Sequence, residues 1–443
     1  MAPGMSLSRR MVGPARQLRI EHLAPEVREK VKIALLDFLS CAYEARDLPW
    51  GCQAIQRVSR DCAGPATVIG TPFRVPPGEA AFANATLGHG LVREDMHTGA
   101  VSHLGVVVFP SLLALAQRHR ASGADFIVAA VCGYEIGAAV GRALMDREIV
   151  SRFRPTGITG PLAGAAAGSR LLGFSEEATV SALGFAANTT GGLNEWPFCG
   201  GDEMFFHPGF AARSAVTAVE LAELGARASV TALDGRAGLF AGLDRAAKLP
   251  DVTPFSGRPF EILSVYHKPA PACNYAQTAC QAALALSAHV ESVQIAAITV
   301  KASAAAVGYP GCDFAGPFDR ILQAKMSIQY CVAATLARRA IEEANYRVLS
   351  DAEIGRLAAV TKLETDAAFT AAYPHRQGAE VILTLRDGRT LRHRMDDLKP
   401  ASPQEIRARF RAAAGAAGGA IEAAVDRLEH EEDAGALCAL LGT

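Results

Sequence analysis

The sequence predicts a mainly α-helical fold with an α+β part: a large all-helical domain, and a smaller α+β lid domain inserted before the C-terminal helices. Two observations support this prediction. Ala, Leu and Gly recur with helical spacing from about residue 24 to 265, and an Ala-rich helical pattern returns from 402 to 443. Between these stretches the pattern changes to β-branched runs, turns and a hairpin. We therefore assign residues 19–265 and 402–443 to the helical domain and residues 266–401 to the lid domain.

Several segments of the helical domain carry the signals of helix ends. PEVREKVKIALLDFLSCAYEA begins with Pro25 near a first turn, and FPSLLALAQRHRASG reaches Gly123 at its C-terminal end. SEEATVSALGFAANTTGGL begins with Ser175, a favourable N-cap residue, and two carboxylates follow it in the first turn. GPLAGAAAGSRLLGF carries a face of small residues that would let neighbouring helices approach closely. These segments predict an all-helical domain in which some helices are buried.

The lid domain mixes helices with strands. A Pro-broken segment, YHKPAPACNY, is followed by a helical pattern, by the β-branched run IAAITVKAS, and by a long helix from about Pro317 to Asn345. The stretch AEVILTLRDGRTLRHRM alternates apolar and polar residues on both sides of Asp387-Gly388. This alternation around an Asp-Gly pair is typical of a β-hairpin.

Composition limits the classes of function and the location. Lys and Arg number 44 against 45 Asp and Glu, and this balance argues against a nucleic-acid-binding protein. Residues 1–18 lack a hydrophobic signal core, so we interpret them as a flexible tail. Apolar stretches such as VVVFPSLLALAQ are too short or too broken by Gly and Pro to span a bilayer. Ten scattered cysteines without a CxxC pair favour reduced, buried thiols in a cytoplasmic protein.

Titratable residues gather in one short stretch, LGHGLVREDMHTGAVSH, which covers residues 87–103. It holds three histidines and two acidic residues: His89, Glu94, Asp95, His97 and His103. Glycines punctuate the stretch and predict a loop, which is where reactive side chains are commonly held. HExxH and other zinc spacings are missing from the sequence, so we predict no metal. Single histidines here could instead cap helices or satisfy backbone groups; for the loop as a whole we favour a functional role.

Other segments supply groups that suit an anionic ligand. In DEMFFHPGFAARSA, His207 precedes a predicted helix whose free N–H groups can hold a carboxylate, and Arg213 lies about one turn further on. SRFRPTGITG adds Arg154 ahead of a Gly-rich helix start. An ordinary helix start is the alternative in each case. Together these groups favour a small polyanionic substrate.

Three further candidates lie in the predicted lid domain. YHKPAPACNYAQ presents Lys268 and Cys273 at the domain boundary, with Lys268 as an anion anchor. Cys273 would be nucleophilic only with a lowered pKa, and a packed thiol is the alternative. Lys325 lies among apolar residues in QAKMSIQYC, where it either reaches the surface or pairs with a substrate carboxylate.

These segments, in this order, resemble the MmgE/PrpD family, whose members include 2-methylcitrate dehydratase, cis-aconitate decarboxylase and iminodisuccinate epimerase. The resemblance covers roughly residues 20–440 and includes RFRPTGITGPLAGAAAGSRLLGF, FFHPGFAARSAVTAVELAELGA, HKPAPACNYAQTACQAAL and DRILQAKMSIQYCVAATLARRAI. It implies a large helical domain built from both ends of the chain, a lid domain between them, an active site in the cleft and a homodimer. It also implies cofactor-free chemistry at a carbon next to a carboxylate.

The chain departs from the family pattern at several positions. Val92 stands where the pattern has its first Asp, and Met204 stands where it has a lysine. Arg154 and Gln277 occupy positions that are usually histidine. The loss of the Asp and the Lys weakens the case for 2-methylcitrate dehydratase or cis-aconitate decarboxylase activity specifically.

We predict a cofactor-independent lyase, of the dehydratase or decarboxylase type, that acts on a small di- or tricarboxylate. His103 is the expected principal acid/base, with Asp95 or His97 as its counterpart. The expected substrate-binding residues are His89, Glu94, Arg154, His207, Arg213, Lys268, Cys273 and Lys325. The alternatives are an epimerase or isomerase in the same cleft and a catalytically altered binding protein. The expected partners are a small anionic carboxylate and a second copy of the chain, without nucleic acid or membrane.

Overall fold

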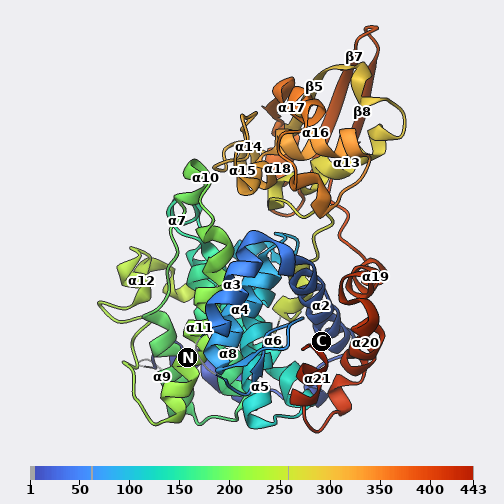
Figure 1. The fold of residues 1–443 in the computed structure, drawn as a ribbon. Coiled ribbons are helices and arrows are strands. Elements are labelled where there is room, and N and C mark those ends of the chain that lie inside the picture. The colour runs from blue at the N-terminus through green and yellow to red at the C-terminus, as the bar shows by residue number, and fades with distance from the viewer. Residues whose placement is uncertain (1–4, 61–62, 258, 443) are drawn as a thin grey trace.

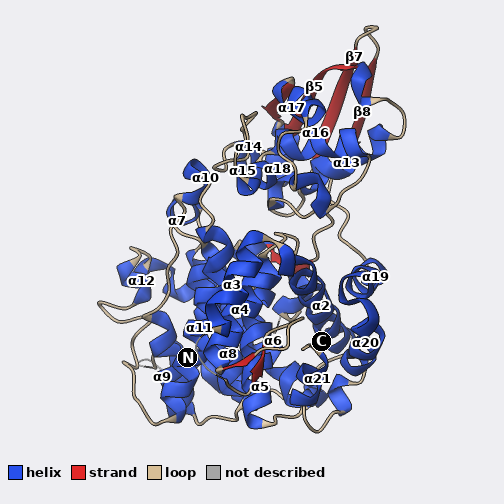
Figure 2. Cartoon of the chain, viewed as in Figure 1, coloured by secondary structure: helices blue, strands red, loops and turns tan. Residues whose placement is uncertain are grey.

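The computed structural model has two lobes, and it describes every residue except 1–4, 61–62, 258 and 443. Figure 1 shows a large lobe that contains both ends of the chain and a smaller lobe joined to it by extended segments. Helices build the large lobe, and the four-stranded sheet lies in the small lobe (Figure 2). The predicted fold class, mainly α with an α+β part, is confirmed.

Long buried helices form the centre of the large lobe. They are α2 (Pro25–Glu44), α4 (Pro77–His89), α5 (Gly105–His119), α6 (Gly123–Leu144), α8 (Pro155–Leu171) and α11 (Glu203–Glu223). Helix α8 packs against α5, α6 and α11. Its small residues permit this close packing, because a Cβ on Gly164 would lie 2.6 Å from the Cβ of Ala215.

Shorter elements surround these helices. They are α3 (Pro49–Ser59), α7 (Arg147–Arg152), α9 (Glu176–Ala187), α10 (Trp196–Cys199), α12 (Leu239–Gly242) and the short strands β1 (Ala66–Thr67), β2 (Arg74–Val75), β3 (Met96–His97) and β4 (Val265–Tyr266). Strands β3 and β4 pair antiparallel. This pairing fixes the chain that enters the small lobe beside the loop that holds the histidines.

The C-terminal helices return to the large lobe. They are α19 (Pro403–Ala414), α20 (Gly418–Asp426) and α21 (Gly435–Leu440). Helix α19 packs against α2. The carbonyl of Leu441 accepts hydrogen bonds from the Gly70 amide at 2.7 Å and from the Tyr43 hydroxyl at 3.1 Å. The small lobe is therefore an insertion within a helical lobe built from both ends of the chain.

The sheet of the small lobe has the order β6-β5-β7-β8. The strands are β5 (Ile295–Ala302), β6 (Thr361–Thr365), β7 (Ala379–Leu385) and β8 (Thr390–Met395); β5 and β6 are parallel and the other pairs antiparallel. The accompanying helices are α13 (Gln277–Ser287), α14 (Ala304–Val307), α15 (Ile321–Met326), α16 (Ile328–Arg338), α17 (Ala352–Ala359) and α18 (Ala367–Ala372). The predicted hairpin around Asp387-Gly388 is confirmed as β7–β8, and Gly388 has the positive φ of 84° that its turn requires.

Two predictions about local structure are wrong. The predicted flexible tail contains helix α1 (Leu7–Gln17), which buries Leu7, Met11 and Val12 and packs against α9. The apolar residues of α1 are few and are separated by Arg and Gly in the sequence, so the helix was not predicted. Residues 1–4 of the predicted tail lie outside the described residues. The predicted long helix near 317–345 is divided, because Ser327 has an extended backbone and caps α16 with its side chain.

Helix α6 is more apolar than the sequence prediction allowed for. Its 22 residues are long and apolar enough to cross a bilayer, but 89% of the relevant window is buried inside the protein. Packing in the centre of the large lobe thus accounts for its composition. Most of the described cysteines are also buried, and those described are free thiols.

Candidate active site

A small pocket lies where the two lobes meet, and both lobes line it. The large lobe contributes Val92, Met96, Val101, His103, Arg154, Pro155, Trp196 and Met204. The segment that enters the small lobe contributes Lys268, Cys273, Asn274 and Tyr275, and the small lobe adds Tyr309 and Met326. Val92 and Met204, which depart from the family pattern, therefore lie in the pocket itself.

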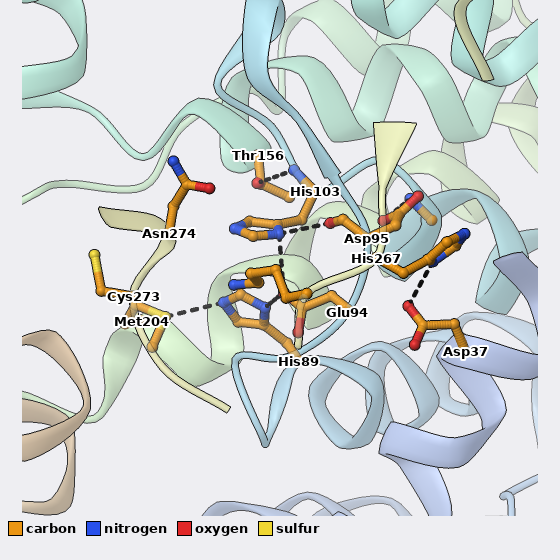
Figure 3. Close-up of polar contacts among 12 residues, drawn as sticks. Asp37, His89, Glu94, Asp95, His103, Thr156, Met204, His267, Cys273 and Asn274 are labelled. Carbon is orange, nitrogen blue, oxygen red and sulfur yellow. Dashed lines mark hydrogen bonds and ion pairs between the residues drawn. The ribbon is translucent and has the colours of Figure 1, made fainter. Parts of the chain in front are cut away.

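The ring of His103 is held from one side only. Its Nδ1 lies 2.8 Å from the carbonyl oxygen of Asp95 and 3.0 Å from Oε1 of Glu94. Both are acceptors, so Nδ1 carries the proton and Nε2 has the free lone pair. In Figure 3 the ring points away from Asp95, toward the side on which Asn274, Cys273 and Met204 lie. Its geometry is that of a base directed into the pocket.

Glu94 connects His103 to a second histidine. Oε1 of Glu94 lies 2.6 Å from Nδ1 of His89, and Nε2 of His89 lies 3.0 Å from the guanidinium of Arg154. Arg154 can only donate, so Nε2 of His89 accepts and Nδ1 donates to Glu94. His89 itself is fully buried behind the pocket, and it orients Arg154.

Burial and neighbouring charges set the protonation states of these groups. Burial lowers the pKa of His103 well below its ordinary value, with Glu94 opposing the shift and Lys268 adding to it. Burial also lowers the pKa of His89. For Glu94, burial acts to raise the pKa, but His89 and His103 outweigh it and hold that pKa below its usual range. The directions of these shifts favour an ionised carboxylate at Glu94 and the neutral form of each imidazole.

Two cations line the pocket without a carboxylate partner in the described part of the chain. Arg154 is buried, lies over the ring of Trp196 at 5.6 Å, and has an Nε atom without a hydrogen-bond partner among the described residues. Lys268 is fully buried, and its ammonium donates to the Ala272 carbonyl at 3.4 Å. Burial lowers the pKa of Lys268, and Glu94 opposes that shift. Buried cations of this kind can bind a ligand carboxylate.

The thiol of Cys273 also lines the pocket. Its Sγ lies 3.6 Å from Sγ of Cys312. This contact lowers the pKa of Cys273, and burial opposes it. Cys273 thus occupies its expected place, next to Lys268 in the predicted segment.

The two expected counterparts of His103 do not line the pocket. The carboxylate of Asp95 accepts from the Gly105 amide at 3.2 Å and from the Tyr134 hydroxyl, and burial raises its pKa to about 6. His97 accepts from the Ala100 amide at 3.0 Å through Nδ1, and its Nε2 lies 2.9 Å from Glu261. Both side chains are occupied in the packing of the loop rather than directed at the pocket.

Three expected carboxylate ligands are also placed elsewhere. Arg213 is 47% exposed and pairs with Glu79 at 2.7 Å. Lys325 is fully buried and donates to Glu343 at 2.5 Å and to two backbone carbonyls, so its three N–H donors are used. His207 is buried outside the pocket lining, its Nδ1 has no partner among the described residues, and burial lowers its pKa to about 3.

Several lining residues had no signal of their own in the sequence. Asn274 and Tyr275 lie within the quoted Pro-rich segment, where they directly follow Cys273. Trp196, Tyr309 and Met326 come from separate elements, and only the folding of the two lobes brings them together. Among the described residues, no group of three or more His, Cys, Asp and Glu side chains could hold a metal ion.

The loop between α4 and α5 has an unusual backbone at two pocket residues. Val92 and Val101 have φ angles of 59° and 49°. A β-branched residue rarely adopts this left-handed conformation, and strain of this kind clusters at functional sites. Both residues line the pocket, and Glu94 and Asp95 lie between them in the sequence.

A helical lobe, an inserted α+β lobe and a histidine-containing pocket between them define a two-lobed protein with an interlobe site. Sequence models of the MmgE/PrpD N-terminal domain and the MmgE/PrpD C-terminal domain match residues 9–250 and 270–432. The chain belongs to the MmgE/PrpD family, as its motifs predict.

Curated relatives carry related names. A cis-aconitate decarboxylase-like protein of Aspergillus oryzae is 34% identical over 47% of this chain and 45% of its own length. A cis-aconitate decarboxylase of Aspergillus terreus is 30% identical over 51% of this chain and 47% of its own length. The mouse cis-aconitate decarboxylase is 27% identical over 98% of this chain and 93% of its own length. The match to the fungal relatives thus spans less than half of their length, whereas the match to the mouse protein spans nearly all of it.

Proposed function

We propose that this chain is a lyase that acts on a small carboxylate by acid/base chemistry at the carbon next to the carboxyl group. The state of His103 carries the proposal: its Nδ1–H is held by Glu94 and the Asp95 carbonyl, and its Nε2 faces the pocket. The names of the relatives, all cis-aconitate decarboxylases or a protein like them, support a lyase. The proposed steps use only side chains of this chain, without a cofactor.

The substrate carboxylate binds to Arg154 and Lys268, the two cations of the pocket that have no carboxylate partner among the described residues. Nε2 of His103 then takes a proton from the carbon next to that carboxylate. The electron pair left on carbon spreads onto the carboxylate oxygens, where the two cations stabilise the added charge. Glu94 stabilises the imidazolium that forms.

The same groups allow two lyase reactions, and only the first begins with the proton abstraction just described; the second begins with His103 already protonated. In dehydration, a C–O bond breaks while the C=C bond forms, and His103 returns its proton to the departing hydroxyl group as water. In decarboxylation, a C–C bond to a carboxylate breaks, CO2 leaves, and an imidazolium at His103 gives its proton to the carbon. The lowered pKa of His103 makes the neutral ring its resting state, so we favour a reaction that begins with proton abstraction. Decarboxylation is the alternative, because the relatives carry that name.

Epimerisation is a second candidate function. It requires a second group that returns a proton to the opposite face of the carbon. Lys268 lines the same pocket and has a lowered pKa, as such a group needs. Incorporation of deuterium from D2O into recovered substrate, without loss of water or CO2, would distinguish epimerisation from a lyase reaction.

A histidine pair provides the experiment. His103→Asn keeps a donor near the Nδ1 position but removes Nε2, so we expect kcat to fall by a factor of about 10²–10⁴ with an unchanged fold. His97→Gln is the matched control, because its amide can still donate to Glu261 outside the pocket. Small di- and tricarboxylates are supplied, and loss of water, release of CO2 and proton exchange are measured. Full activity of His103→Asn would rule out the proposed base.

Assembly and location remain proposals. We propose a homodimer, as the family resemblance implies, and a cytoplasmic location, as the scattered cysteines without a CxxC pair favour. Analytical ultracentrifugation of the purified chain tests the homodimer, and fractionation of its source cells tests the cytoplasmic location.

A further inference from the structure

The pocket carries little charge for a site that would bind a polyanion. Arg154 and Lys268 are the charged side chains among its lining residues. Directly behind them Glu94 is ionised, and it faces the same site through His89 and His103. Two positive charges and one nearby negative charge leave a net charge of about one to be balanced by a ligand.

Three further cations are already paired with carboxylates within the protein. Lys325 pairs with Glu343 at 2.5 Å, and Arg93 pairs with Glu44 at 2.8 Å. Arg213 pairs with Glu79 at 2.7 Å at the surface. None of the three lines the pocket. A third ligand carboxylate would therefore enter without a cation to meet it.

Besides the two cations and His103, Cys273, Asn274, Tyr275 and Tyr309, the rest of the pocket wall is apolar. Its apolar side chains are Val92, Met96, Val101, Pro155, Trp196, Met204 and Met326. Met204 extends this wall up to the polar groups, because its Sδ lies 3.7 Å from the Arg154 guanidinium. Thioether side chains adapt to the shape of an apolar group and contribute no charge. The wall thus suits a hydrocarbon substituent better than a carboxylate, which would be buried there without a partner.

We infer that the substrate is a mono- or dicarboxylate with an alkyl substituent, and not a tricarboxylate. Its carboxylates bind Arg154 and Lys268, and the alkyl group packs against Met204, Met96 and Met326. This inference rests on the proposed function for the identity of the site, and it replaces the broader expectation of a di- or tricarboxylate. It makes Met204 a specificity-determining residue.

Binding of three probe compounds to the wild-type protein tests the inference without requiring turnover. The probes are maleate, 2-methylmaleate and cis-aconitate, which share the same alkene geometry and differ by one methyl group or one carboxylate. By isothermal calorimetry we expect 2-methylmaleate to bind about tenfold more tightly than maleate, as one methyl group in an apolar pocket allows. We expect cis-aconitate to bind at least about tenfold more weakly than 2-methylmaleate, because its third carboxylate lacks a cation. Equal or tighter binding of cis-aconitate would overturn the inference.

Substitutions at Met204 locate the effect. Met204→Leu keeps the apolar wall and should retain the preference for 2-methylmaleate. Met204→Gln adds no charge but makes the wall polar, and should reduce the preference for the methyl group. Met204→Lys supplies a third cation and should shift the preference toward cis-aconitate by about tenfold. If no Met204 variant changes the preference among the three probes, the assignment of Met204 to the apolar wall is wrong. If Met204→Lys fails to fold, the binding measurements on the wild-type protein still decide the inference.

This experiment separates the inference from the proposed lyase function. Preferential binding of 2-methylmaleate by a protein that turns over no carboxylate would support the pocket's ligand class and refute the lyase. Turnover of cis-aconitate with the lowest KM of a substrate panel would support the lyase and refute the ligand class.

Discussion

Oε1 of Glu94 lies 3.0 Å from Nδ1 of His103 and 2.6 Å from Nδ1 of His89, so one carboxylate oxygen accepts from two imidazoles. This relationship determines the tautomer of both rings. It leaves Nε2 of His103 as a base at the pocket and Nε2 of His89 as an acceptor for Arg154. A buried carboxylate thus controls the acid/base group and one of the ligand-binding cations at once.

The first prediction concerns Glu94 as a positioning residue. Glu94→Gln removes the negative charge that raises the pKa of His103. Its neutral amide oxygen is also a weaker hydrogen-bond acceptor for the two imidazole rings than the carboxylate oxygen. We expect kcat to fall by about 10–100-fold, as for other groups that orient a reactive ligand. The low-pH limb of the rate profile should also move to lower pH, which a purely structural role would not cause.

Asp95→Asn is the matched control for Glu94→Gln. Its side chain contacts Tyr134 and Gly105, and only its backbone carbonyl contacts His103. The Asp95→Asn enzyme should therefore keep the pH profile of the wild type. A shift of that profile equal to the shift in Glu94→Gln would contradict the division of roles.

The second prediction is the pH dependence of kcat/KM. His103 must be neutral to take a proton, and burial places its pKa well below the ordinary 6.5, so activity should be lost only as pH falls below that value. Lys268 must be protonated to hold a carboxylate, and burial lowers its pKa from 10.5, so activity should fall as pH rises through a value below 10.5. Lys268→Arg should move the alkaline limb to higher pH, because a guanidinium keeps its charge. An acid limb at or above pH 6.5 would contradict the assignment of His103.

Much of the fold could be predicted, because local patterns record it. The hairpin was predictable from alternation around Asp387-Gly388, and the helical domain from its periodicity. The division of the long helix at Ser327 was not, because an extended residue in a helical context leaves little trace in the sequence. Helix α1 was not predicted, although Ser6 caps it and its buried residues lie at helical spacing; it is short, and it packs against α9.

The candidate site could be predicted as a set of residues but not as an arrangement. His89, Glu94 and His103 do lie together, since His89 is the last residue of α4 and the other two lie in the loop that follows it. Two pocket residues, Val92 and Val101, have left-handed backbone conformations, and their residue type does not predict these turns.

Ion pairs between distant segments were equally invisible in the sequence. Lys325 pairs with Glu343 and Arg213 with Glu79, and these pairs remove two expected ligands from the site. A Lys or Arg side chain is a good candidate for binding an anionic ligand only when the fold does not pair it with a carboxylate of the same protein.

The third prediction compares two arginines that the sequence treated alike. Arg154→Gln should raise KM for a carboxylate substrate by at least about tenfold, because it removes a buried charge-assisted contact. Arg213→Gln should leave KM unchanged and alter the free energy of unfolding by no more than about 1 kcal/mol, since its pair with Glu79 is exposed. Steady-state kinetics and urea unfolding check both variants. An equal rise in KM for the two would place Arg213 at the substrate.

The last prediction concerns the contact between the lobes at Lys325. Its ammonium donates to the carbonyls of Leu91 and Pro271 at 3.0 and 3.1 Å, and these belong to the two chain segments that border the pocket. Lys325→Met leaves Glu343 buried without its partner, so we expect a loss of about 3–5 kcal/mol in the free energy of unfolding. The double variant with Glu343→Gln removes the stranded charge and should recover part of this loss. Urea unfolding of the wild type, both single variants and the double variant gives the coupling energy directly. If Lys325→Met is as stable as the wild type but loses substrate affinity, Lys325 binds substrate after all and the ion pair is not its main role.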